Sequence, residues 1–387
     1  MTQQELQAAL AYSIEKVRLS VETLNDFPER CEGDEWTTIQ LYRLPLDRAH
    51  WVDGFWTGLI WLAYGHTGDA GLERDAREWT ERLAWLRTST GTHDLGFIFY
   101  LSHVLGARLT GDEALLPNAV EAAGTLIRRF NAKGEFLQAW GELNGPPQDR
   151  GRTNIDLMMN LALLFWASAH TGDVRYARVA ARHARTSRLT MMRPDGSTSH
   201  VADFDPDTGA FIRQETYQGL SATSCWSRGQ GWALHGFVDC YRRTGDEVFL
   251  AAARQLAAYT LANAPDDLVP FWDYNSPDIP NTPRDSSAAA VMASGLLDLA
   301  ACESDGERAG RWREAAEAMT LSLWRNYSSR GTNRPAILLH ATRSLPHGYA
   351  DHGLIYGDYY FVETLTKLLR PDVAGRAFPA PERLSVT

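Results

Sequence analysis

Apolar residues recur along most of the chain with the 3.6-residue period of a helix. Every second periodic segment is apolar nearly all round, as in LMMNLALLFWASA, and the segments between them alternate apolar residues with Arg and Glu, as in REWTERLAWLR. A helix that is apolar all round is buried, and an amphipathic helix covers it. The pattern predicts twelve helices, six inside and six outside, over 3–24, 54–66, 69–88, 94–109, 112–130, 154–170, 173–189, 228–243, 246–263, 285–303, 307–326 and 356–369.

The tripeptide Thr-Gly-Asp occurs four times, each time between an apolar segment and an amphipathic one, at 67–69, 110–112, 171–173 and 244–246. Gly adopts the left-handed conformation after a helix end, and Asp caps the next helix. One such turn is ordinary, but four with the same flanks indicate a repeated helical hairpin. We therefore predict an all-α fold, an (α/α)6 barrel or toroid of six helical hairpins, which forms a single catalytic domain over residues 1–387.

The lengths of the connections predict where the functional site lies. Connections from an inner to an outer helix are short, whereas most return connections are about 20 to 40 residues long. Antiparallel hairpins in a ring make the inner helices parallel, so their N-termini share one face with the long loops. Long loops in compact domains are usually functional, and helix N-termini favour anions. We expect the site at this mouth, with a small anion-bearing molecule as its ligand.

Composition excludes several partners. The 387 residues contain 38 basic and 48 acidic side chains, a net charge of −10, which argues against nucleic acid as a partner. No apolar run reaches the length of about 18 residues that a membrane span needs. The N-terminal segment lacks the pattern of a signal peptide, and four scattered cysteines without C-x-x-C spacing are typical of reduced thiols. We expect a cytoplasmic protein, either a monomer or a homodimer.

The predicted mouth collects aromatic and polar residues of the kind that bind sugars. The chain has 13 Trp, 14 Tyr and 14 Phe. Aromatic faces cover the apolar face of a pyranose, polar groups fix its hydroxyls, and carboxylates transfer protons. The segments expected there are 51–56, 92–94, 138–141, 153–156, 200–205, 217–219, 226–232, 272–274 and 284–287.

The candidate residues in these segments also fit purely structural roles. Asp94 fits a helix cap, Asp156 fits a capping box that begins at Thr153, and Arg228 fits an ordinary surface position. The convergence of several long loops on one face favours the functional interpretation. No metal is predicted, because His93 and Asp94 are adjacent and the chain lacks H-E-x-x-H and clustered Cys and His.

Eight short segments extend this picture, taken in order: 51–56 (WVDGFW), 93–97 (HDLGF), 138–141 (QAWG), 151–152 (GR) with Asp156, 218–219 (QG), 226–230 (WSRGQ), 284–287 (RDSS) and 356–360 (YGDYY). In this order they resemble the unsaturated glucuronyl hydrolases, glycoside hydrolase family 88, over roughly residues 10 to 370. The family has an (α/α)6 barrel, the fold that the helical pattern predicts.

The resemblance implies an unusual glycosidase that needs no cofactor. Its substrates are small oligosaccharides left by polysaccharide lyases, which carry a 4,5-unsaturated uronic acid at the non-reducing end. The family hydrates this vinyl ether: a proton adds to C4 and water to C5. The hemiketal then opens, the glycosidic bond collapses, and a 5-keto deoxyuronate is released. The distance rule that separates retaining from inverting glycosidases does not apply to this reaction.

The same resemblance assigns roles to nine residues. Asp156 matches the family's proton donor and base, and Asp94 matches its second essential carboxylate. The positions that match sugar-contacting residues are Trp51, His93, Trp140, His200, Gln218, Arg228 and Trp232. Of these, a guanidinium at Arg228 is the expected partner of the uronate carboxylate.

Two departures and two alternatives accompany this interpretation. Tyr217 stands where many relatives have His. The loop before Tyr356 lacks the Lys that relatives use for sulfated substrates, which leaves Arg343 or His347 as a source of positive charge.

The first alternative is another sugar enzyme on the same toroid, an unsaturated rhamnogalacturonyl hydrolase or an N-acyl-hexosamine epimerase. The second is a toroid that binds oligosaccharides without catalysis.

Overall fold

The computed structural model describes residues 2–39 and 51–386, and it confirms the twelve predicted helical segments. The inner helices are α2 (Asp53–Thr67), α4 (Leu95–Phe99) with its continuation through the π-helical η3 (Tyr100–Val104) into α5 (Leu105–Thr110), α8 (Leu157–Thr171), α10 (Ser227–Thr244), α12 (Ser286–Cys302) and α14 (Ile355–Leu369). The outer helices are α1 (Thr2–Thr23), α3 (Ala70–Glu81), α6 (Leu116–Leu126), α9 (Val174–Met191), α11 (Glu247–Ala262) and α13 (Gly306–Ser322).

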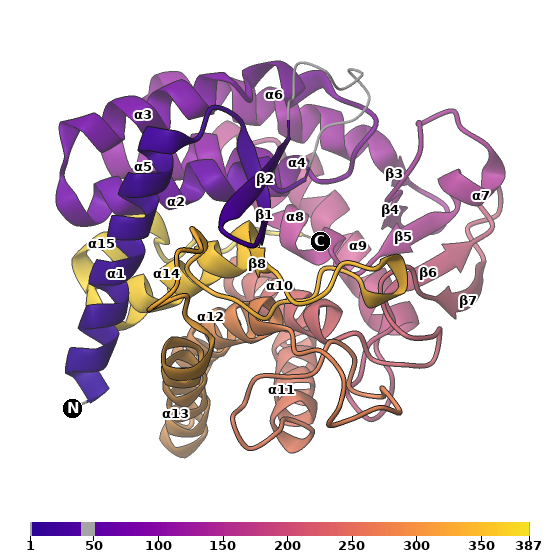
Figure 1. Cartoon of the computed structure of the whole chain (residues 1–387). Coiled ribbons are helices and arrows are strands. Elements are labelled where there is room, and N and C mark those ends of the chain that lie inside the picture. Colours follow the sequence, from indigo (N-terminus) through magenta and orange to yellow (C-terminus); the bar gives the residue numbers. More distant parts are fainter. Residues whose placement is uncertain (1, 40–50, 387) are drawn as a thin grey trace.

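The inner helices form a closed ring. Each packs against the next in the order α2, α4, α8, α10, α12 and α14, and α14 packs back against α2 (Figure 1). Glycines let neighbouring helices approach closely: a Cβ added to Gly96 of α4 would lie 2.4 Å from the Cα of Asn160 on α8. The predicted (α/α)6 toroid is therefore confirmed, and α4 and α8 touch backbone to backbone near their N-termini.

The Thr-Gly-Asp turns have the predicted conformation. Gly68, Gly111, Gly172 and Gly245 have φ values of 66°, 76°, 76° and 70°. The aspartate that follows each glycine accepts a hydrogen bond from the backbone N–H two residues later, at the start of the next helical segment. The repeat is thus a structural device that closes four of the hairpins.

The long loops contain short elements that helical periodicity does not predict. Three small sheets have the orders β2-β1-β8, β3-β4 and β5-β6-β7. Their strands are β1 (Phe27–Glu32), β2 (Glu35–Ile39), β3 (Phe130–Asn131), β4 (Phe136–Leu137), β5 (Arg152–Asn154), β6 (Val201–Phe204), β7 (Phe211–Glu215) and β8 (Gly353–Leu354). Short helices add α7 (Pro147–Arg150), α15 (Pro371–Ala377), η2 (Ala84–Thr88), η4 (Glu113–Leu115), η5 (Ile127–Arg129), η6 (Leu323–Tyr327) and η7 (Leu345–His347).

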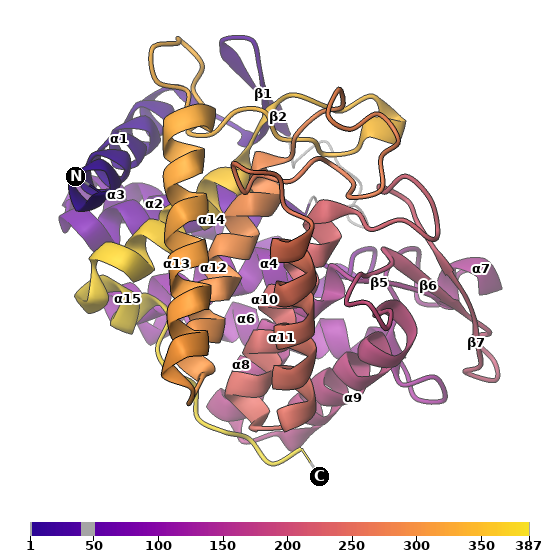
Figure 2. The ribbon, with the colours of Figure 1, turned by 90° about the horizontal axis from the view of Figure 1, so that it is seen from below.

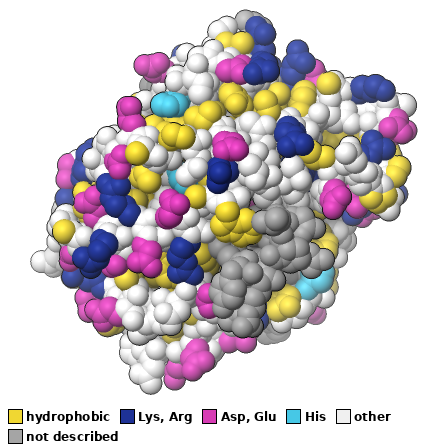
Figure 3. All heavy atoms as spheres, turned by 90° about the horizontal axis from the view of Figure 1, so that it is seen from above, with side chains coloured by type: hydrophobic (Ala, Val, Ile, Leu, Met, Phe, Trp, Pro, Cys, Tyr) yellow, Lys and Arg dark blue, Asp and Glu magenta, His cyan; other side chains and the backbone are white. Residues whose placement is uncertain are grey.

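The two ends of the toroid differ. Figure 2 shows β1, β2 and long loops at one end, β5 to β7 at the side, and the C-terminal tail at the other end. The face of the molecule drawn in Figure 3 carries acidic and basic side chains mixed with one another.

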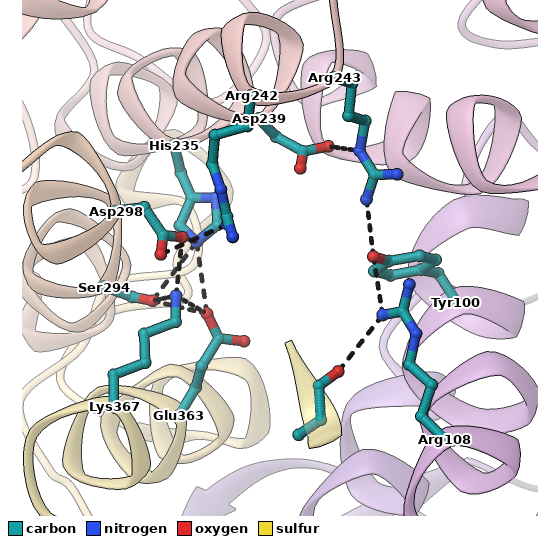
Figure 4. Close-up of polar contacts among 11 residues, drawn as sticks. Tyr100, Arg108, His235, Asp239, Arg242, Arg243, Ser294, Asp298, Glu363 and Lys367 are labelled. Atoms are coloured by element: carbon teal, nitrogen blue, oxygen red, sulfur yellow. Dashed lines mark hydrogen bonds and ion pairs between the residues drawn. The ribbon is translucent and has the colours of Figure 1, made fainter. Parts of the chain in front are cut away.

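A polar cluster occupies the end near the C-terminal tail (Figure 4). Lys367 Nζ lies 2.8 Å from Asp298 Oδ2 and 2.7 Å from Glu363 Oε1. On the other side of the cluster, Arg243 and Arg108 both donate to the hydroxyl of Tyr100, over 2.7 and 3.0 Å. The tail fixes this end, because the N–H of Leu384 donates to the carbonyl of Arg243.

Replacing Lys367 with Met is expected to destabilise the fold by about 3–5 kcal/mol at neutral pH, because the carboxylate of Glu363 loses its ammonium partner and Asp298 keeps only the more distant Arg242, at 3.5 Å. Burial acts to raise the pKa of Asp298 and Glu363, but the charge of Lys367 is the largest opposing cause and their pKa values lie below the ordinary 3.8 and 4.5. A carboxylate with a lowered pKa stabilises the fold above its ordinary pKa, and this contribution is lost as the pH falls.

The difference in unfolding free energy between wild type and Lys367→Met should therefore shrink as the pH falls below about 4.5. Urea unfolding of both proteins at neutral pH and at lower pH values measures it. Equal stability of the two proteins at neutral pH would contradict the prediction.

Candidate active site

A cavity of about 530 Å³ opens at the end where the inner helices begin. Asp94 and Asp156 directly precede α4 and α8, Trp226 directly precedes α10, and Trp51 lies shortly before α2. The cavity is lined by Trp51, His93, Asp94, Trp140, Asn154, Asp156, Tyr217, Gln218, Trp226, Trp232, Arg343, Ser344, His347 and Tyr349. Seven of the nine predicted site residues thus meet at one cavity; His200 and Arg228 lie behind its wall.

The two oxygens of the Asp156 carboxylate have different surroundings. Asn154 Nδ2 donates to Oδ2 over 3.0 Å, and His200 Nε2 lies 3.5 Å from the same oxygen. Within the described residues, Oδ1 is buried and has no hydrogen-bond partner. One oxygen is therefore held by neighbouring side chains, and the other is buried without a hydrogen-bond partner among the described residues.

A small sheet brings His200 to Asp156. Strands β5 and β6 pair Asn154 with Val201, and the N–H of Ile155 donates to the carbonyl of His200 over 2.9 Å. His200 is thus placed beside a residue 44 positions earlier in the chain. Its side chain has no exposed surface, and its Nε2 lies near the carboxylate without a hydrogen-bond partner among the described residues.

Backbone contacts fix the proton position on both histidines. His200 Nδ1 accepts the N–H groups of Tyr217 and Gln218, over 3.1 and 3.0 Å, so in the neutral ring the proton is on Nε2, facing Asp156. His93 Nδ1 lies 2.5 Å from the carbonyl of Ala139, which can only accept. Its Nδ1 therefore carries a proton, and its Nε2 lies 3.1 Å from Asn154 Nδ2 and 3.3 Å from Asp94 Oδ1.

Asp94 is buried among polar partners. Its Oδ2 lies 3.2 Å from Thr92 Oγ1, and its Oδ1 accepts from Asn160 Nδ2 over 3.3 Å. Burial raises the pKa of Asp94, and the charge of Asp156 raises it further against the opposing effect of His93. Asp94 therefore takes up a proton more readily than an exposed aspartate does.

Asn160 is a site residue that sequence reasoning missed. Besides contacting Asp94, its side-chain oxygen accepts the N–H of Phe97 over 2.9 Å, so it joins α4 to α8 just below the two carboxylates. Its position was a signal: it is the one polar residue within the apolar run LMMNLALLFW. A buried amide in such a run needs hydrogen-bond partners, and one of its partners here is Asp94, a predicted catalytic residue.

Aromatic rings form the walls of the cavity. The ring of Trp140 lies 6.0 Å from His93, 6.2 Å from His200 and 6.0 Å from Tyr217, measured between ring centroids. Trp232 is buried at the floor, and Tyr217, 57% exposed, marks the outer edge. The cavity therefore offers aromatic faces from its floor to its rim.

Arg228 does not have the free guanidinium that the sequence interpretation assumed. Its side chain is 0% exposed, and Nη1 lies 2.6 Å from Asp285 Oδ2. Nη1 and Nη2 also donate to the carbonyls of Thr342 and Arg343, each over 2.6 Å. The charge is already paired, so this geometry favours a role in holding the segment at 342–344; direct contact with a substrate stays a prediction.

The loop before α14 supplies lining residues that the sequence did not single out together. Arg343, Ser344, His347 and Tyr349 all reach the cavity from this loop. Arg343 forms an ion pair with Glu29, which joins the loop to β1.

Comparison with known proteins identifies a family and several relatives of this chain. The family model described as Glycosyl Hydrolase Family 88 matches residues 32–298. An unsaturated glucuronyl hydrolase of Bacillus sp. (strain GL1) is 39% identical over 332 residues, 84% of this chain and 87% of the relative. An unsaturated chondroitin disaccharide hydrolase of Streptococcus agalactiae is 33% identical over 386 residues, 96% of this chain and 93% of the relative.

The fold agrees as well. The crystal structure of an unsaturated glucuronyl hydrolase from Bacillus sp. GL1 superimposes with a TM-score of 0.85 at 35% identity, covering 96% of this chain and 97% of that one. The family model and the relatives show a carbohydrate-active enzyme of the glycosidase class. The chain belongs to glycoside hydrolase family 88, and this membership favours hydrolysis over the epimerase and binding-only alternatives.

Two features are absent from the part of the chain that the structure describes. Between 2 and 39 and between 51 and 386, no group of three or more His, Cys, Asp or Glu side chains is arranged to hold a metal ion. In the same ranges, no helix combines the length and the apolarity that crossing a bilayer requires.

Proposed function

We propose that this enzyme removes the 4,5-unsaturated uronic acid from the non-reducing end of small lyase-generated oligosaccharides, with Asp156 as proton donor and base. The observation that carries the proposal is the Asp156 carboxylate at the aromatic cavity, with Oδ2 held by Asn154 and Oδ1 without a partner among the described residues. A carboxyl group held this way can pass a proton to a carbon atom of a bound sugar and take one back.

In the proposed reaction, protonated Asp156 gives its proton to C4 of the sugar. The electron pair of the C4=C5 bond forms the new C4–H bond, and the ring oxygen stabilises the positive charge at C5. Water then adds to C5 and returns a proton to Asp156. The hemiketal opens, the bond between C1 and the leaving sugar breaks, and a 5-keto deoxyuronate is released, so that one water is consumed in each turnover.

The surrounding residues have supporting roles in this proposal. Asp94, whose pKa is raised by burial and by the charge of Asp156, takes up a proton more readily than an exposed aspartate does. His200 faces Asp156 with its Nε2 proton. Trp51, Trp140 and Trp232 supply the faces on which the ring of the unsaturated sugar packs, and Gln218 lies beside them.

The cellular location of the enzyme and its oligomeric state stay predictions. A cytoplasmic location is supported by the cysteines, since Cys31, Cys225, Cys240 and Cys302 are all free thiols. A monomer or homodimer is expected, with the oligosaccharide as the partner of the site.

A panel of unsaturated disaccharides made by lyases from hyaluronan, chondroitin, heparin, gellan, xanthan, ulvan and pectin tests the proposed function. The conjugated double bond absorbs ultraviolet light, and we expect this absorbance to disappear with at least one member as the sugar is released. If the absorbance of every disaccharide in the panel persists with folded enzyme, the proposal is wrong.

A further inference from the structure

The wall behind Trp140 and Asp94 contains a buried cation. Arg129, the last residue of η5, is 3% exposed, and no carboxylate of the described residues lies in ion-pair contact with it. Burial lowers the pKa of Arg129 to about 10, and the charge of Asp94 opposes this effect. Arg129 is therefore still charged at neutral pH.

This state distinguishes Arg129 from the other arginines around the cavity. Each of those is paired with a carboxylate: Arg152 with Asp203, Arg228 with Asp285 and Arg343 with Glu29. Arg129 alone among these four keeps an uncancelled positive charge beside the catalytic carboxylates.

Backbone carbonyls take the place of a carboxylate around Arg129. Nε donates to the carbonyl of Gln138 over 2.7 Å and Nη1 to that of Thr90 over 2.5 Å. Nη2 lies 3.1, 3.0 and 2.9 Å from the carbonyls of Ala139, Trp140 and Gly141. The chain at 138–141 therefore curls around one guanidinium, which also reaches the loop before Asp94.

The conformation of the chain at 138–141 depends on the positive charge of Arg129. Carbonyl dipoles that converge on one point repel one another, and a planar guanidinium with five donors neutralises several of them at once. Two side chains of the site depend on this curl: Trp140 projects from it into the cavity, and His93 donates to the carbonyl of Ala139 that Arg129 shares.

We propose that Arg129 is a positioning residue of the active site, which holds Trp140 and His93 in place through the carbonyls at 139–141 and supplies a fixed positive charge beside Asp94. The inference rests on the proposed function, because it is read through the activity of the enzyme. It goes further in assigning a role to a side chain that touches no substrate.

The positioning role is tested by a double-mutant cycle between Arg129 and Trp140. Arg129→Lys keeps the charge but lacks the planar set of donors, so we expect kcat/KM to fall roughly 10- to 100-fold, mainly through KM. In a Trp140→Ala background the platform is already gone, so the same substitution should lower kcat/KM by a clearly smaller factor, and the loss that remains reports the positioning of His93. Arg254→Lys, on outer helix α11 and paired with Glu303, is the matched control and should match wild type.

The charge role is tested by the pH dependence of kcat/KM. The charged or titratable groups that face Asp94 are His93 beside it, Asp156 at the start of α8 and Arg129 from η5. Arg129→Gln removes one positive charge near Asp94, which raises the pKa of its carboxyl group. The change in kcat/KM that accompanies the titration of Asp94 should therefore move to higher pH by roughly one unit. Arg129→Lys should leave it at the wild-type pH.

The outcomes separate the two proposals. Wild-type enzyme that turns over no unsaturated disaccharide refutes the proposed function. Active wild type with equal losses from Arg129→Lys in both Trp140 backgrounds, together with an unmoved titration of Asp94 in Arg129→Gln, refutes the role of Arg129. If Arg129→Gln fails to fold, the cycle with Arg129→Lys decides the positioning role alone, and full additivity there overturns it.

Discussion

Asp156→Asn should abolish turnover and leave the fold intact. The amide cannot give a proton to C4 or take one from water, and loss of a group that serves as both acid and base costs on the order of 10²–10⁴-fold or more in kcat. The fold should survive because the Asp156 side chain makes no capping hydrogen bond to α8. Only its charge near a helix N-terminus is lost, which is worth about 0.3–1 kcal/mol.

Two measurements check this result: loss of ultraviolet absorbance from an unsaturated disaccharide, and the midpoint of thermal unfolding. Asp203→Asn is the matched control, since Asp203 lies on the same small sheet, pairs with Arg152 and does not line the cavity. It should retain turnover. Normal turnover by Asp156→Asn would remove Asp156 from the reaction.

Arg228→Ala is expected to lower the free energy of unfolding by about 3–5 kcal/mol, because Asp285 is left as a buried and unpaired charge. The carbonyls of Thr342 and Arg343 also lose their donors, and Arg343 lines the cavity, so KM should rise as well. Urea unfolding and steady-state kinetics measure the two effects.

The free acid and the methyl ester of the substrate separate two roles of Arg228. If it acts through the segment at 342–344, its removal should weaken both substrates equally. If it binds the uronate carboxylate directly, the variant should lose its preference for the free acid. A variant with the unfolding free energy of wild type would contradict the structural role of the ion pair with Asp285.

Much of the architecture is predictable from the sequence because it depends on local patterns. The 3.6-residue period separates inner from outer helices, and the Thr-Gly-Asp turns set their hairpins, since Gly68 and Asp69 act within a few residues of themselves. The meeting of Asp94 and Asp156 at one cavity is predictable for the same reason, because they stand at the starts of inner helices and parallel helices bring these starts to one face. Their catalytic roles are implied only by the family resemblance.

The rest depends on contacts between distant segments. The pairing of His200 with Asp156 is made by strands of three and four residues, which are too short to show a period. Arg228 reads as an available cation until Asp285, 57 residues away, is placed against it. Arg129 lies in an ordinary basic pair at the end of a helix, and only the folding of 138–141 around it reveals its surroundings.

The central claim is that the double bond, and not the anomeric carbon, is the group that reacts. Two disaccharides that differ only at C4 and C5, one unsaturated and one saturated, test it directly when each is incubated with wild-type enzyme and released sugar is measured by chromatography. Release from the unsaturated disaccharide alone is the predicted result. Comparable release from the saturated one would contradict the account, because that bond can be cleaved only by attack at the anomeric carbon.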